Sequence, residues 1–89
     1  MYGIFFDCLE QFVVTTFGMR TWSVVLQKAD IGIGMKARWT ANENYPDEVY
    51  MKLITLLAFE TDRSFDGLVE QLGSFFTTFI RYAAARLVR

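Results

Sequence analysis

The chain has 89 residues, of which 53% are hydrophobic and 17% aromatic, and it carries a formal net charge of -1 with no histidine. This length supports a single domain, and the scarcity of glycine and proline argues against disorder. The near-neutral charge provides no basic field for nucleic acid, and the missing imidazole removes the commonest general base and metal ligand. We therefore expect one helical domain, residues 1–89, with a large apolar interior or an apolar ligand.

The first predicted helix covers about residues 2–17. Its apolar side chains recur at steps of one, three and four residues, which places them on one broad helical face: Ile4, Phe5, Cys8, Leu9, Phe12, Val13 and Phe17. Gly18 is expected to end this helix as a C-terminal cap in the left-handed conformation.

A shorter helix is expected over about residues 20–29, with an apolar edge formed by Trp22, Val25, Leu26 and Ala29. Apolar residues then alternate over 31–39, and this period of two permits a short strand or an extended segment. The third helix is expected to open at Tyr45-Pro46-Asp47-Glu48, because proline and acidic residues suit a first helical turn. Its buried face comprises Val49, Leu53, Ile54, Leu56 and Leu57, and its pattern stops near Thr61.

The fourth helix is expected to begin after Ser64, a favourable N-cap residue, and could run to the end of the chain. Its stripe is the clearest of the four: Phe65, Leu68, Val69, Leu72, Phe75, Phe76, Phe79, Ile80, Ala83, Ala84 and Leu87. Gly73 lies within this stripe and allows two interpretations. It either marks close approach by another backbone or a flat ligand, or it ends one helix before the next begins at Ser74.

The residue inventory argues against an enzyme. Without histidine there is no Ser-His-Asp or Cys-His nucleophile system, and no CxxC or HExxH motif predicts a metal site. Cys8 is the single cysteine, and its place on an apolar face is typical of a small buried hydrophobe rather than a reactive thiolate. We expect a cytoplasmic protein, because neither a signal-peptide pattern nor the roughly 18 apolar residues of a membrane span are present.

Four local signals together carry a family resemblance. They are Met1-Tyr2-Gly3-Ile4 opening into a helix, Phe17-Gly18 followed by Trp22, Tyr45-Pro46-Asp47-Glu48, and Leu72-Gly73 followed by Phe75, Phe76 and Phe79. In this order and spacing, over about residues 1–80, they resemble the N-terminal part of the heme-nitric oxide/oxygen binding (H-NOX) domain. That domain is the gas-sensing module of soluble guanylate cyclases and of bacterial signalling proteins.

The resemblance implies an all-α fold, a compact bundle of about four helices that closes over the distal side of a heme. It implies heme as the cofactor and places Phe5, Leu9, Phe76 and Ile80 against the porphyrin. Such an apolar lining, without a hydrogen-bond donor, would favour NO and CO over O₂.

In the family, a histidine beyond the matched region holds the iron, and a Tyr-x-Ser-x-Arg motif holds the propionates. This sequence contains neither. The resemblance therefore implies a shortened sensor domain without the usual histidine ligand. Cys8, Tyr2, Tyr82 or a methionine stays open as a ligand to the iron.

The alternative hypothesis is a non-heme helical interaction module. Its exposed apolar face, including Phe75, Phe76, Phe79 and Ile80, would bind a second copy of the chain or a signalling protein. Attachment to a membrane surface through the arginine-tipped last helix is disfavoured, because the polar face is thin and the net charge is near zero.

Overall fold

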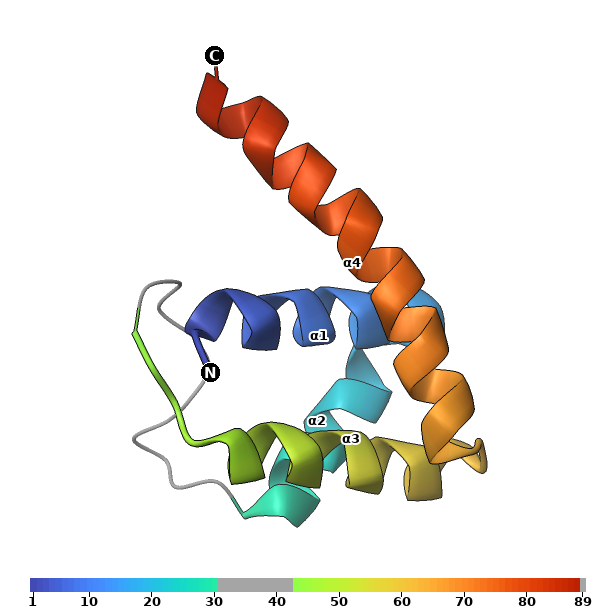
Figure 1. Ribbon diagram of the computed structural model, residues 1–89. Coiled ribbons are helices and arrows are strands. Elements are labelled where there is room, and N and C mark those ends of the chain that lie inside the picture. The colour runs from blue at the N-terminus through green and yellow to red at the C-terminus, as the bar shows by residue number, and fades with distance from the viewer. Residues whose placement is uncertain (31–42, 89) are drawn as a thin grey trace.

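The computed structural model describes residues 1–30 and 43–88, which form four α-helices, so the predicted all-α fold is confirmed. These are α1 (Gly3–Phe17), α2 (Met19–Ala29), α3 (Asp47–Thr61) and α4 (Phe65–Val88). α2 packs against α1 and α3, while α4 starts beside the end of α3, crosses α1 and continues past it (Figure 1). The strand or extended segment expected over 31–39 lies outside the described residues.

A single glycine makes the turn between α1 and α2. The N–H group of Gly18 donates hydrogen bonds to the carbonyl oxygens of Val13 and Val14, both at 3.1 Å, and Gly18 also caps the start of α2. The expected left-handed cap is wrong in detail, because φ is 103° but ψ is 156°, outside the left-handed helical region. This backbone conformation is open almost only to glycine, which explains the residue at this junction.

The starts of α3 and α4 follow from local chemistry. Pro46 takes the N-cap position of α3, one residue before the predicted place, and Asp47 and Glu48 occupy the acidic first turn. Ser64 accepts a hydrogen bond at its Oγ from the N–H group of Gly67, at 3.0 Å, which confirms the predicted N-cap of α4.

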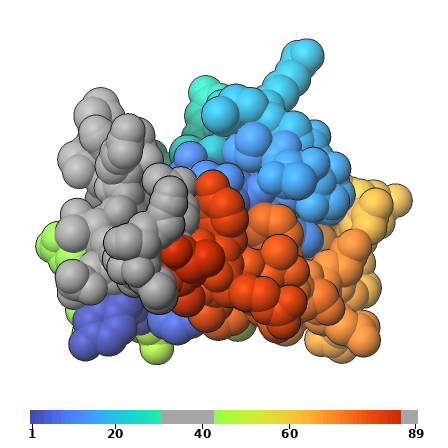
Figure 2. Space-filling view, turned by 90° about the horizontal axis from the view of Figure 1, so that it is seen from above, coloured from blue at the N-terminus to red at the C-terminus, as the bar shows by residue number. Residues whose placement is uncertain are grey.

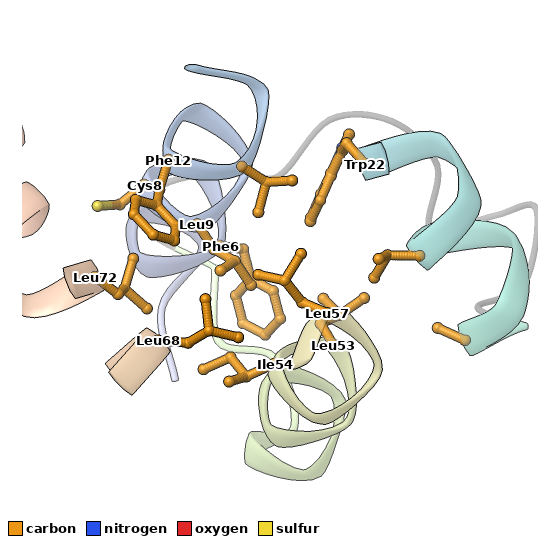
Figure 3. Packing of buried hydrophobic residues seen from close by; sticks show 13 residues of the cluster. Phe6, Cys8, Leu9, Phe12, Trp22, Leu53, Ile54, Leu57, Leu68 and Leu72 are labelled. Atoms are coloured by element: carbon orange, nitrogen blue, oxygen red, sulfur yellow. The ribbon is translucent and has the colours of Figure 1, made fainter. Parts of the chain in front are cut away.

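All four helices contribute to one apolar core, shown in Figure 3. Its buried members are Phe6, Cys8, Leu9, Phe12, Val13, Trp22, Val25, Ala29, Leu53, Ile54, Leu57, Leu68 and Leu72. Phe6 is fully buried, although the predicted α1 stripe omitted it. Its ring lies edge-on to the ring of Tyr45, which precedes α3, and to the ring of Tyr50, which lies in α3. The core therefore occupies the side of α1 that faces α2 and α3 as well as the predicted face.

α4 runs without interruption through Gly73, so the interpretation that this glycine ends a helix is wrong. Its later turns project beyond the other helices (Figure 1), and its orange and red surface is visible in the space-filling view from above (Figure 2). Within the described part of the chain, none of the helices has both the length and the apolarity required to cross a bilayer.

Candidate functional site

An apolar groove lies where α1, α3 and α4 meet. Its volume is about 380 Å³, within the range of roughly 300–1,000 Å³ typical of small-molecule sites. The described residues that line it are almost all apolar: Met1, Phe5, Tyr50, Met51, Ile54, Phe65, Val69, Leu72, Gly73 and Phe76. We call this feature the apolar groove.

Two phenylalanines join the α1 and α4 walls of the apolar groove. The rings of Phe5 and Phe76 are stacked, with centroids 5.3 Å apart and an angle of 19° between their planes. Both side chains are half-buried, so each also presents apolar surface to whatever occupies the groove. Offset stacking of this kind holds the two walls together while leaving ring surface exposed.

Gly73 opens the α4 wall. A Cβ atom built at this position meets no other heavy atom within 4 Å, so no other described segment packs against it. The interpretation that another backbone approaches this glycine is therefore wrong for the described chain. The missing side chain leaves open space in the groove wall. The interpretation that a flat ligand approaches Gly73 stays a prediction.

The structure brings together two of the four predicted porphyrin contacts. Phe5 and Phe76 meet in the apolar groove. Leu9 is only 1% exposed and points into the core (Figure 3), and Ile80 is 37% exposed and does not line the groove.

Sequence reasoning missed several lining residues, among them Met1, Tyr50 and Met51. Tyr50 and Met51 lie next to the predicted face of α3, and no sequence signal distinguishes them from other residues at its border. Met1 precedes the first helix, so helical periodicity does not apply to it. Only the arrangement of the helices in the fold reveals that these three residues line one groove.

The positions of the candidate side chains show which of them could reach an iron in the apolar groove. Cys8 is a buried residue of α1 with 1% exposure, and Tyr2 and Tyr82 are exposed residues that do not line the apolar groove. The thioethers of Met1 and Met51 and the phenol of Tyr50 do line it. Thioether and phenolate groups are both known to hold heme iron in proteins.

Burial controls the ionisation of the two titratable groups near the core. Loss of hydration raises the pKa of the Cys8 thiol to about 11, with a smaller contribution from the nearby Asp7 carboxylate. Burial likewise raises the pKa of Tyr50 to about 12, with a smaller contribution from Cys8. Both groups are therefore neutral at physiological pH, and Cys8 lacks the thiolate character of a metal ligand or nucleophile.

A second, larger hollow lies between α1 and the projecting part of α4, with a volume of about 640 Å³. Its described lining is mixed: Asp7, Gln11, Phe75, Thr78, Phe79, Tyr82 and Ala83. We call this second hollow the outer recess. The aromatic stripe of α4 is divided between the two features, because Phe76 lines the apolar groove whereas Phe75 and Phe79 line the outer recess. The smaller groove suits an apolar planar ligand better, because its described lining carries no charged side chain.

Comparison with protein families shows which family the sequence matches. The sequence matches the Haem-NO-binding family over residues 2–89, nearly the whole chain. The chain belongs to the Haem-NO-binding family. The matched residues include both α1 and α4, which form walls of the apolar groove.

Two solved structures of an H-NOX protein from S. oneidensis have a similar fold. A triple mutant in the Fe(II) ligation state superposes with a TM-score of 0.82, and a structure in the Fe(II)NO ligation state superposes with a TM-score of 0.80. Each is 22% identical in sequence, and the match covers 99% of this chain. It covers 46% and 47% of the chains in those two structures, so this chain spans about half their length. A comparison with curated protein sequences finds no significant match.

Proposed function

We propose that this Haem-NO-binding family member packs its apolar groove against one face of a heme and serves as part of a gas sensor. The observation that carries the proposal is the groove itself, with stacked Phe5 and Phe76 beside the open position at Gly73. A planar apolar macrocycle requires such a surface, apolar and without charged side chains. The residues present fit that requirement on one side of the ring.

Each part of the groove has a distinct role in this proposal. Phe5 and Phe76 supply flat apolar contact, and Val69 and Leu72 extend it along α4. Gly73 lets the ring approach the helix backbone, because no side chain fills the space there. Bound heme would supply the iron that binds a diatomic gas, and these side chains would exclude water from that side of it.

The lining also bears on which gas would be bound. Apolar surroundings favour NO and CO over O₂, because bound O₂ carries partial negative charge and gains from a hydrogen-bond donor. Tyr50 is the exception among the described lining residues, since its neutral phenol is an O–H donor at the α3 wall. Comparing NO, CO and O₂ affinities of the heme-loaded protein with those of Tyr50→Phe measures what this hydroxyl contributes.

The direct test is a hemin titration followed by absorption in the Soret region. We expect a saturable Soret shift for the unaltered chain, and Gly73→Leu should weaken hemin binding by about tenfold or more because the leucine fills the groove. Ser74→Leu is the matched control, because the next residue of α4 lies outside the groove lining. A silent titration of the unaltered chain, or equal weakening by both substitutions, contradicts the proposal.

The exposed apolar surface favours a second role, binding another copy of the chain or a signalling protein. Val69 and Met51 at the groove are 43% and 48% exposed, and Tyr82 at the outer recess is 62% exposed. Surfaces of this kind commonly mark interaction sites. The mass in solution, measured with and without hemin, separates the roles: a dimer that hemin dissociates places the copy in the groove, and an unchanged monomer excludes it.

A further inference from the structure

Arg63 lies in the turn between α3 and α4 and contacts three helices. Its backbone N–H group donates to the carbonyl oxygen of Ala58 in α3 at 3.0 Å. Its guanidinium lies over the ring of Phe17 at the end of α1, with Cζ 5.1 Å from the ring centroid, and Nη1 donates to Gln71 Oε1 in α4 at 3.4 Å. Figure 1 shows the end of α1, the end of α3 and the start of α4 on one side of the molecule. The Arg63 side chain therefore joins α4 to α1 close to the point where α4 begins.

Edge-to-face rings continue from this contact to the crossing of α4 with α1. The ring of Phe17 meets that of Phe12 at an angle of 88°, with centroids 6.1 Å apart. Phe12, which is 3% exposed, meets Phe75 of α4 at 62°, with centroids 5.6 Å apart. Because aromatic pairs prefer particular relative orientations, displacement of one ring changes the preferred place of the next. Arg63 is thus connected through packed rings to the part of α4 that crosses α1.

The same part of α4 forms a wall of the apolar groove. Phe76 follows Phe75 directly in the sequence, and its ring lines the groove and stacks on the ring of Phe5. Arg63 and Phe17 themselves do not line the groove. A change in the angle between α4 and α1 would move the Phe76 wall relative to the Phe5 wall and so alter the width of the groove.

We propose that Arg63 is a positioning residue that sets the angle between α4 and α1, and with it the shape of the apolar groove for its ligand. This inference rests on the proposed heme-binding function. The guanidinium suits the role because it is planar, so its face can cover a ring while its edge donates a hydrogen bond. Arg63 and Gln71 are both exposed, so their contacts contribute little to overall stability and act mainly on geometry.

The test compares hemin binding by Arg63→Gln with that by Arg20→Gln. Arg20 is an exposed residue in the first turn of α2 and does not line the groove, so the control removes the same charge elsewhere. The match is needed because hemin carries anionic carboxylates, which any cation on the protein attracts. We expect Arg63→Gln to weaken hemin binding by about threefold to tenfold, and Arg20→Gln to stay within about twofold. Arg63→Lys keeps the charge without the planar group, so it should restore only part of the affinity.

A double-substitution cycle tests whether Arg63 acts through the ring of Phe17. Phe17→Leu removes the ring and should itself weaken hemin binding. The variant that combines Arg63→Gln with Phe17→Leu should then bind hemin about as tightly as Phe17→Leu alone, because one contact can be lost only once. Losses that add would show that Arg63 acts by another route, which contradicts the proposal.

A distance measurement on the apoprotein provides a readout that does not depend on heme. Spin labels at Thr16→Cys and Ala84→Cys, exposed positions in α1 and late in α4, report the angle between the two helices. Cys8→Ala in the same chain leaves these two thiols as the only sites for labelling. We expect Arg63→Gln to broaden or shift the distribution of distances between the labels, and Arg20→Gln to leave it unchanged.

The outcomes separate this inference from the proposed function. If hemin binds but Arg63→Gln matches Arg20→Gln in affinity or in the distance distribution, the positioning role is wrong and the heme site stands. If hemin binds to none of these proteins, the proposed function is wrong. A shifted distance would then leave Arg63 only a structural role, which also overturns the inference about the ligand.

Discussion

The ring of Phe5 on α1 lies against the ring of Phe76 on α4, 5.3 Å between centroids and 19° from parallel. Seventy-one positions separate these residues in the sequence, yet their contact fixes where α4 crosses α1 and where the apolar groove begins. Phe12 and Phe75 form a second contact between the same helices, with centroids 5.6 Å apart. Aromatic pairs thus set the crossing on which the proposed site depends.

Replacing Phe76 by alanine tests this crossing. We expect Phe76→Ala to lower the free energy of unfolding by about 1–2 kcal/mol, because the stack is lost and a half-buried ring is removed. Hemin affinity should fall as well. Phe59→Ala is the control, because Phe59 is 80% exposed and away from the groove, and urea unfolding should show little change there. Equal losses in the two variants would contradict the role of the stack.

Truncation of Leu9 should destabilise the protein much more than truncation of Ile80. Leu9→Ala should cost about 2–5 kcal/mol in the free energy of unfolding, because the side chain is buried in the core and its loss leaves a cavity. Ile80→Ala should cost less than about 0.5–1 kcal/mol, because this residue is 37% exposed. Chemical denaturation measures both, and hemin affinity of the folded Ile80 variant shows whether that residue contacts a ligand. Weaker hemin binding there would support the porphyrin contact predicted from the family resemblance.

The N-cap of α4 can be tested at Ser64. Ser64→Ala should destabilise the protein by about 1 kcal/mol, because the N–H group of Gly67 loses its acceptor at 3.0 Å. Ser64→Asp retains an acceptor and adds charge at the favourable end of the helix, so it should restore the melting temperature. A melting temperature unchanged by the alanine substitution would show that water replaces the hydroxyl without cost.

Alkaline pH should destabilise the fold through Cys8 and Tyr50. Their pKa values rise from 9.0 to about 11 and from 10.0 to about 12, so the folded state holds both protons more tightly than the unfolded chain. This contribution is fully present below the unfolded pKa values and is lost as the pH rises through about 9 to 12. Urea unfolding across that range should show a smaller loss of stability for Cys8→Ala. An identical pH profile for the variant and the unaltered chain would contradict burial of the thiol.

Much of the fold follows from local sequence chemistry. The sequence alone predicts the starts of two helices, at Pro46 and Asp47 for α3 and at Ser64 for α4. This is possible because these residues act through hydrogen bonds and charges within a few residues. Helical periodicity also places Trp22 and Leu53 in the core. These features require no knowledge of how the helices are arranged.

The groove depends on arrangement and is therefore harder to predict. Phe5 and Leu9 lie one helical turn apart on a single face, and only the crossing of α4 makes the first a groove residue and the second a core residue. Phe75 and Phe76 are adjacent in sequence but enter different hollows for the same reason. The contact between Arg63 and Phe17 joins residues far apart in the chain, which no local pattern indicates.

The continuity of α4 through Gly73 has a mechanical consequence. A helix of 24 residues is about 36 Å long, and the buried side chains described in it, Leu68 and Leu72, lie in its earlier turns. The crossing with α1, where the aromatic rings meet, is the point about which such a helix would tilt. A tilt of a few degrees imposed there would displace the far turns of α4 by more than the turns beside the aromatic stack.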